Sequence, residues 1–269
     1  MLSGLCRSGQ HSQSGCLAHC LLSQARSGLL TCSTVSLSGE TMIAAELLQP
    51  TTQLAGWLLY LPLLGWALWR APWLELFSDL RRQHLLGGTA LVLFLLWLVR
   101  RDFDSGLSYH FIGMTAVTLL LDWPLAVLAG FAAQLGMVAL GRQDLAALGV
   151  NGLLLVAIPV AVTEICALRV ERAQPRNLFV YIFFSGFFAA ALAVLLCVGA
   201  GVAVLWMDGL FPMPPWLGDF IGYLWLVMFP EAFINGMLVT ALVVFYPDWL
   251  ETFNRSRYLA APWKGDDRP

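Results

Sequence analysis

The chain has 269 residues, of which 59% are apolar and only 12% are charged, and its mean hydropathy is +0.74. Soluble domains carry about 25% charged residues, so this composition excludes a soluble protein and predicts an integral membrane protein in contact with lipid. The formal net charge of -2 is small. With no basic patch and no RNA-type aromatic motif in the sequence, we expect no nucleic acid partner.

Residues 1–41 differ in composition from the rest of the chain. They are rich in Ser, Gly and Cys, hold four of the six cysteines, and contain no acidic residue before Glu40. They include no apolar run of signal-peptide length followed by a small-residue cleavage site. We expect 1–41 to be a disordered N-terminal tail, or an upstream segment that is not translated because synthesis starts at Met42.

Seven apolar stretches follow, and they predict an all-α, polytopic membrane domain of about seven transmembrane helices over residues 42–250. A polar tail occupies 251–269. The expected helices cover about 53–69, 85–99, 109–121, 124–140, 150–168, 178–207 and 220–246.

Lys and Arg residues between these stretches predict the orientation, because cytoplasmic loops carry an excess of positive charge. One side of the predicted bundle has ten such residues and the other has three, with residues 1–41 left out of the count. The N-terminus is therefore expected outside and the C-terminus in the cytoplasm. The richer side holds Arg70, Arg81, Arg82, Arg169, Arg172, Arg176, Arg255, Arg257, Lys264 and Arg268, and the poorer side holds Arg100, Arg101 and Arg142.

The stretch 109–130 contains an unusual break. An apolar piece of about 13 residues, roughly 20 Å long at helical rise, ends at Asp122-Trp123-Pro124. This is too short for a hydrocarbon core of about 30 Å. One interpretation is a short intramembrane helix that forms a polar site away from lipid. The other is two ordinary antiparallel helices joined by a tight turn.

Polar side chains inside the predicted spans are the candidates for function, because ionisable groups in a membrane are costly. His110 is the only histidine in a span and could bind a transition metal or satisfy a hydrogen bond at a helix end. Asn151 could be a helix N-cap or a contact in a pore. Glu231 and Asn235 share a helix face and could line a cavity or hydrogen-bond to the stretches 150–168 or 178–207.

Common catalytic motifs are absent from the sequence, including the P-loop, H-E-x-x-H and G-x-S-x-G. We therefore expect transport rather than catalysis. An intramembrane enzyme that uses His110 and Glu231 as acid and base is the less favoured alternative, because we expect the two residues to be separated in depth by roughly 10 Å or more at helical rise.

The segment 106–159 resembles the energy-coupling-factor permeases for cobalt and nickel, the CbiM and NikM proteins. The resemblance extends more loosely over about 105–250. It is carried by His110, Gly113, Trp123, Pro124, Gln134, Leu148-Gly149 and Asn151.

This resemblance implies a seven-helix permease of the bacterial inner membrane that captures Ni²⁺ or Co²⁺ as substrate, with no covalently bound cofactor. In the family, a separate transmembrane coupling protein and ATPase subunits drive release. The metal is held by the terminal amine, a histidine at position two and a histidine that matches His110. Asn151 and Gln134 would hold the pocket's geometry.

The chain departs from this pattern at its start, since Leu2 follows Met1 and Ile43 follows Met42. The expected N-terminal histidine is therefore missing. An alternative function is a permease-fold protein that has lost metal transport and acts as a scaffold or binds another solute.

Overall fold

The computed structural model describes residues 43–102, 108–173, 177–209 and 224–253, with the single positions 218, 222 and 258. The expectations for residues 1–41, and for most of the tail 251–269, fall outside these described residues. All structural statements below concern the described part of the chain.

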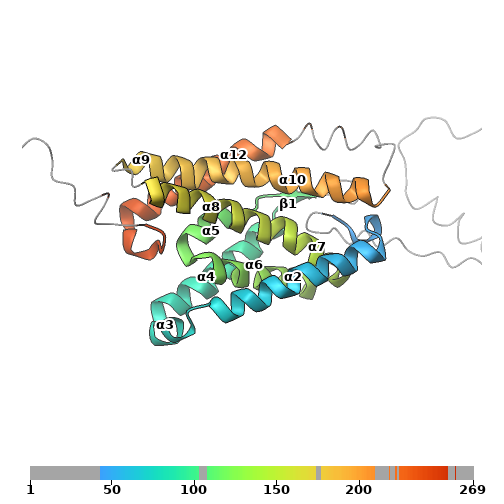
Figure 1. The fold of residues 1–269 in the computed structure, drawn as a ribbon, viewed down its shortest axis with the longest axis horizontal. Coiled ribbons are helices and arrows are strands. Elements are labelled where there is room, and N and C mark those ends of the chain that lie inside the picture. The colour runs from blue at the N-terminus through green and yellow to red at the C-terminus, as the bar shows by residue number, and fades with distance from the viewer. Residues whose placement is uncertain are drawn as a thin grey trace, which may run out of the picture. The chain divides into compact units, whose positions relative to one another are not determined.

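The elements follow one another as short and long helices with one small hairpin between them (Figure 1). The first half comprises η1 (Ala45–Leu47), α2 (Pro50–Arg70), α3 (Trp73–Ser78), α4 (Leu80–Leu98), β1 (Arg100–Asp102), β2 (Ser108–His110), α5 (Met114–Leu121) and α6 (Trp123–Ala139). The second half comprises α7 (Leu145–Gly152), η2 (Leu153–Ala157), α8 (Ile158–Ala173), α9 (Leu178–Val180), η3 (Tyr181–Phe188), α10 (Ala189–Met207), α12 (Leu224–Phe245) and η4 (Pro247–Trp249).

Three continuous helical stretches in the described residues are long and apolar enough to cross a membrane: Leu145–Ala173, Leu178–Met207 and Leu224–Phe245. Helices α2 and α4 have 21 and 19 residues, or about 30 Å each at helical rise. Apolar side chains are exposed along these helices, as at Leu58, Leu59 and Phe229, which suits contact with lipid. The prediction of a helical domain with membrane-spanning stretches is confirmed for these three, and the number of seven spans stays a prediction.

The predicted helix 109–121 is wrong in its first five residues. His110 lies at the end of β2, which pairs antiparallel with β1 so that Arg100 is opposite His110. Helix α5 begins only at Met114, because Gly113 before it has φ +69°, a left-handed conformation that interrupts a right-handed helix and favours glycine. The all-α prediction therefore needs one correction, the two-stranded hairpin.

The predicted break at Asp122 is confirmed. Helix α5 ends at Leu121 and α6 begins at Trp123, so Asp122 alone forms the connection, with φ +70° and ψ 159°. Pro124 follows in the first turn of α6, where its missing N–H leaves no helical hydrogen bond unmade. The eight residues of α5 correspond to about 12 Å of rise, which makes it the short helix that the break predicted.

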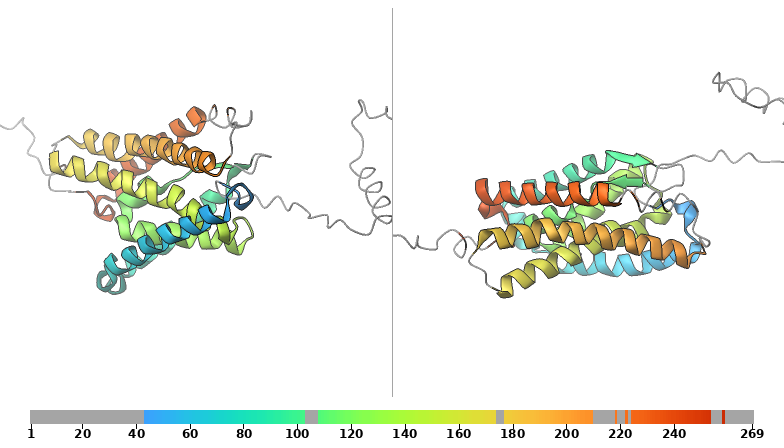
Figure 2. Two further views of the ribbon diagram at one scale, coloured as in Figure 1. Left: turned by 45° about the vertical axis from the view of Figure 1, so that its right-hand side comes forward. Right: turned by 90° about the horizontal axis from the view of Figure 1, so that it is seen from above.

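Helix α2 packs very closely against α7, and glycines make this possible. A Cβ atom at Gly149 would lie 2.6 Å from the backbone nitrogen of Trp57 and 2.8 Å from the carbonyl carbon of Gly56. Helices α4 and α6, α8 and α10, and α10 and α12 are the other large packing pairs. The long helices α2, α10 and α12 run roughly along one direction when seen from above (Figure 2).

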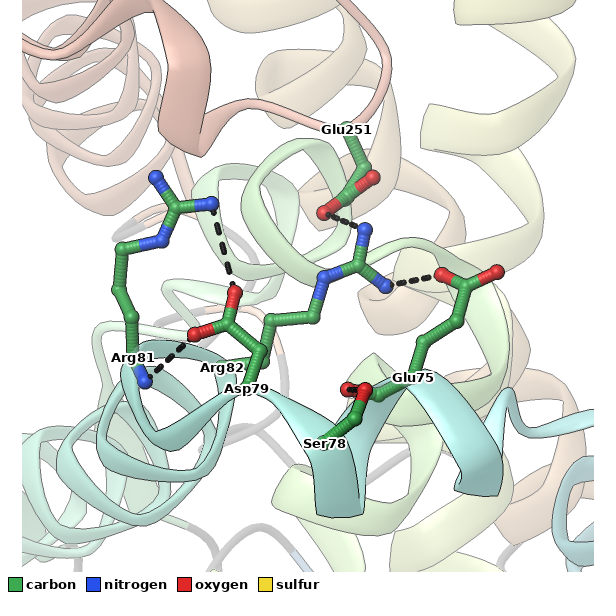
Figure 3. A network of polar contacts seen from close by, with 6 residues as sticks. All are labelled: Glu75, Ser78, Asp79, Arg81, Arg82 and Glu251. Carbon is green, nitrogen blue, oxygen red and sulfur yellow. Dashed lines mark hydrogen bonds and ion pairs between the residues drawn. The ribbon is translucent and has the colours of Figure 1, made fainter.

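The two ends of this bundle carry different features. The hairpin β1–β2 and the N-terminal segment with η1 lie at one end, and α3 and the segment after α12 lie at the other (Figures 1 and 2). At the second end the guanidinium of Arg82 bridges Glu75, at 2.6 Å, and Glu251, at 2.9 Å (Figure 3). Burial raises the pKa of the Glu251 carboxyl, against the opposing effect of Arg82.

We predict that Gly149→Ala destabilises the protein in detergent by about 1–3 kcal/mol, the usual cost of overpacking, because the added methyl group meets the backbone of α2 rather than a movable side chain. Gly88→Ala, in α4, is the matched control, since a Cβ there meets nothing within 4 Å. Thermal unfolding measures both. A Gly149→Ala protein as stable as the Gly88→Ala protein would contradict the close packing.

Candidate functional site

His110 lies at the junction between the hairpin and α5, and its side chain is 7% exposed. Its ring lies 5.7 Å, centroid to centroid, from the ring of Trp97, which is fully buried in α4. The strand pairing with Arg100 fixes its backbone. The imidazole is therefore held in a defined place at the end of the bundle that carries the N-terminal segment.

The hydrogen bond of His110 defines which ring nitrogen carries the proton. Nδ1 lies 2.9 Å from the carbonyl oxygen of Phe111, and a carbonyl oxygen can only accept. Nδ1 must therefore be the donor, which leaves the lone pair of the neutral ring on Nε2. A histidine whose other nitrogen donates to a backbone carbonyl has the arrangement typical of metal ligands.

The backbone just after His110 is held from two sides. The indole Nε1 of Trp97 donates to the carbonyl oxygen of Ile112 at 3.0 Å. From α12, the Glu231 carboxylate accepts from the N–H groups of Ile112, at 2.9 Å, and Gly113, at 2.7 Å. Glu231 therefore contacts the backbone two residues along the chain from His110. The expected separation in depth of the His110 and Glu231 side chains stays a prediction.

Glu231 and Asn235 act together, as their spacing on one helix face predicted. The amide Nδ2 of Asn235 donates to Oε1 of Glu231 at 2.8 Å, and its Oδ1 accepts from the N–H of Ala116 at 2.9 Å. The expected hydrogen-bonding role is found, but the partner is the start of α5 rather than the stretches 150–168 or 178–207. Nothing in these contacts shows the two residues lining a cavity.

Asn151 is not a helix N-cap. Helix α7 begins six residues earlier, at Leu145, with Asp144 at its N-cap position. Asn151 is fully buried, and its side chain forms two hydrogen bonds with the backbone of Ile43. Its Oδ1 accepts from the Ile43 N–H at 3.1 Å, and its Nδ2 donates to the Ile43 carbonyl at 3.0 Å. The amide thus binds the N-terminal segment as a neighbouring strand would.

Gln134, in α6, is also fully buried, and its Oε1 accepts from the hydroxyl of Tyr60 at 2.9 Å. The ring of Tyr60 lies against Gly152, where an added Cβ atom would clash with it. Tyr60, in α2, therefore brings Gln134 close to the part of α7 that holds Asn151. These described bonds place Gln134 and Asn151 as supports for the N-terminal part of the chain, and His110 is held by other residues.

A second anchor of the N-terminal segment was not predicted. The Asp208 carboxylate, just after α10, accepts from the backbone N–H of Gln49 at 2.9 Å and from the hydroxyl of Thr52. In return the Gln49 side chain donates to the Asp208 carbonyl at 2.9 Å. A polar residue before Pro50 and an acid after a long apolar helix were the available signals, but 159 residues separate the partners.

Within the described residues, no group of three or more His, Cys, Asp or Glu side chains is arranged to hold a metal ion. Among the described residues, His110 offers an imidazole at the hairpin end of the bundle.

Comparison with known families decides the identity of the fold. The family described as the cobalt uptake substrate-specific transmembrane region, CbiM, matches residues 43–249. The chain belongs to the CbiM family. The CbiM match begins at Ile43, the residue whose backbone Asn151 holds, and it includes His110, Gln134, Glu231 and Asn235.

A solved structure described as a truncated transition metal transporter is similar to this CbiM chain. The TM-score is 0.60, and the alignment covers 76% of this chain and 98% of the other at 16% identity. At this identity the likeness concerns the fold. No curated protein matches the sequence of this CbiM chain.

We predict that Asn151→Leu releases the segment around Ile43. The N–H and the carbonyl of the buried Ile43 would both lose their partner, at a cost of about 1–3 kcal/mol for each unsatisfied group. Amide hydrogen exchange of a peptide that covers residues 43–48 should become faster. Asn177→Leu is the control, since it removes an amide that bonds the backbone of Phe179 at an exposed helix start. Unchanged exchange at 43–48 in Asn151→Leu would show that this pairing does not hold the segment.

Proposed function

We propose that this CbiM chain is the substrate-binding membrane permease component of an uptake system for a divalent transition metal ion, of the cobalt and nickel class. The observation that carries the proposal is the setting of His110, whose Nδ1 is bonded to a carbonyl so that Nε2 holds the lone pair. Family membership and the fold of the transition metal transporter support it. Transport, and not catalysis, is the activity that we assign.

The proposed topology has seven spans in the bacterial inner membrane, with the N-terminus outside and the C-terminus in the cytoplasm. Two observations support the orientation. Arg70, Arg81 and Arg82 lie where α2, α3 and α4 meet, and Arg82 is bonded to Glu251 of the C-terminal segment. These positive charges therefore share one end with the C-terminal segment, whereas the hairpin with His110 lies at the other (Figure 1).

In this proposal, the substrate enters at the outer end, where His110 contacts it. Release to the cytoplasm requires a separate transmembrane coupling protein and ATPase subunits, as the resemblance to energy-coupling-factor permeases implies. Gln134 and Asn151 would preserve the geometry of the pocket through Tyr60 and Ile43.

A specific observation favours a second candidate, the capture of a solute other than a metal ion. The position after Met42 is Ile43, where the resemblance leads us to expect histidine, and Ile43 is 1% exposed. Its side chain is part of the apolar core. In this second candidate, the protein has kept the permease fold without metal transport, and it binds another solute or serves as a scaffold.

We predict that His110→Ala weakens the binding of Ni²⁺ and Co²⁺ to the purified protein by at least about tenfold, which corresponds to about 1.4 kcal/mol. The reason is the loss of one imidazole ligand. His84→Ala, at an exposed position of α4, is the matched control and should bind both ions as the wild type does. Equilibrium dialysis with metal analysis measures the affinity.

Two outcomes would contradict the assignment of His110 as a ligand of a bound metal ion. If neither the wild type nor the variants bind the ions, the second candidate is favoured. If His110→Ala binds as tightly as His84→Ala, the ion is bound elsewhere and the role of His110 is refuted.

A further inference from the structure

The start of α5 presents N–H groups that its own helix cannot satisfy. The first N–H groups of any α-helix have no acceptor one turn earlier, and a side chain at the N-cap position often supplies one. Here the N-cap residue is Gly113, which has no side chain to offer. The N–H groups of Ile112, Gly113 and Ala116 are instead bonded by side chains of α12.

The acceptors form one unit on consecutive turns of α12. The two oxygens of Glu231 take the N–H groups of Ile112 and Gly113, and Oδ1 of Asn235 takes that of Ala116. Asn235 also donates to Oε1 of Glu231, at 2.8 Å, and to its backbone carbonyl, at 2.8 Å. Glu231 is 2% exposed and Asn235 is fully buried.

A buried carboxylate is costly unless several donors compensate it. Glu231 has three, the two backbone N–H groups and the Asn235 amide, and such charge-assisted hydrogen bonds are short and strong. The position of the backbone at Ile112 and Gly113 therefore depends on α12. If α12 shifts relative to α5, or if Glu231 or Asn235 is replaced, this backbone must move or its N–H groups lose their partners.

His110 is two residues from Ile112, at most about 7 Å along an extended chain. Two further contacts hold the backbone here. His110 itself pairs with Arg100 in the hairpin, and the indole of Trp97 donates to the carbonyl of Ile112. Metal–ligand distances tolerate only about 0.2 Å of error. The direction of the imidazole thus depends on where the 110–113 backbone is held.

We propose that Glu231 and Asn235 are positioning residues for His110, which set the affinity for the transported ion through the backbone of 110–113 without touching the ion. This inference rests on the proposed function, in which His110 contacts a divalent ion. Glu231 and Asn235, the two polar candidates on α12, then act by supporting the imidazole of His110.

The test compares Glu231→Gln with Thr240→Val in the full-length protein. Glutamine has nearly the same shape, but its NH₂ group cannot accept, so one of the Ile112 and Gly113 N–H groups loses its partner. Thr240 also lies on α12 and bonds the Gly236 carbonyl, so its variant controls for the loss of a polar group from that helix. Glu231→Asp keeps the carboxylate on a shorter arm, and Asn235→Ala is the second variant should Glu231→Gln not fold.

Three quantities are measured on folded protein: Ni²⁺ affinity, hydrogen exchange of a peptide covering 110–116, and the thermal midpoint. We expect Glu231→Gln to weaken Ni²⁺ binding roughly tenfold to a hundredfold, the range found for residues that support metal ligands, and to speed exchange at 110–116. Glu231→Asp should retain part of the affinity. Thr240→Val should leave both affinity and exchange unchanged.

The outcomes separate this inference from the proposed function. Ni²⁺ binding that is lost in His110→Ala but kept in Glu231→Gln and Asn235→Ala overturns the positioning role alone. A lower thermal midpoint with normal affinity in the folded fraction also overturns it, because the pair would then serve stability only. Wild-type protein that binds no Ni²⁺ overturns both.

Discussion

Inside an apolar bundle, every peptide group at which the chain leaves a helix must find a polar partner, and this requirement organises the structure. Four such places are satisfied by side chains from remote elements. Asn151 pairs with the backbone of Ile43, Asp208 with that of Gln49, Glu231 with Ile112 and Gly113, and Asn235 with Ala116. Unpaired peptide groups away from water cost several kcal/mol in a membrane, so these few side chains determine how the irregular segments sit on the helices.

The same contacts build the candidate site. The segments 43–49 and 110–113 lie outside the long helices, and the second contains His110, the residue that the family resemblance connects with the substrate. A short helix, α5, follows this junction and ends at the one-residue turn Asp122. The bond between Tyr60 and Gln134, together with the close approach of α2 and α7 at Gly56 and Gly149, fixes α2 against α6 and α7.

Much of this could be predicted from the sequence, for physical reasons. Apolar stretches located the long helices, and the break at Asp122-Trp123-Pro124 located the short one, because such signals are local. The i, i+4 pair Glu231 and Asn235 was also visible as one face of a helix. Its partners were not, since they lie 118 and 119 residues away and only the packing of α12 on α5 brings them together. The N-cap interpretation of Asn151 was wrong for the same reason: a local rule competed with a contact 108 residues distant. The hairpin was missed because its strands have three residues each, too few for an alternating pattern.

The central claim is that the imidazole of His110 is presented to a divalent ion by a backbone held in place from α4 and α12. X-ray absorption spectroscopy of the protein loaded with Ni²⁺ or Co²⁺ tests it most directly, because an imidazole ligand gives a recognisable multiple-scattering pattern. The account predicts that this pattern is present in the wild type and is reduced or lost in His110→Ala. A bound ion without imidazole scattering, or a pattern unchanged in His110→Ala, would contradict it.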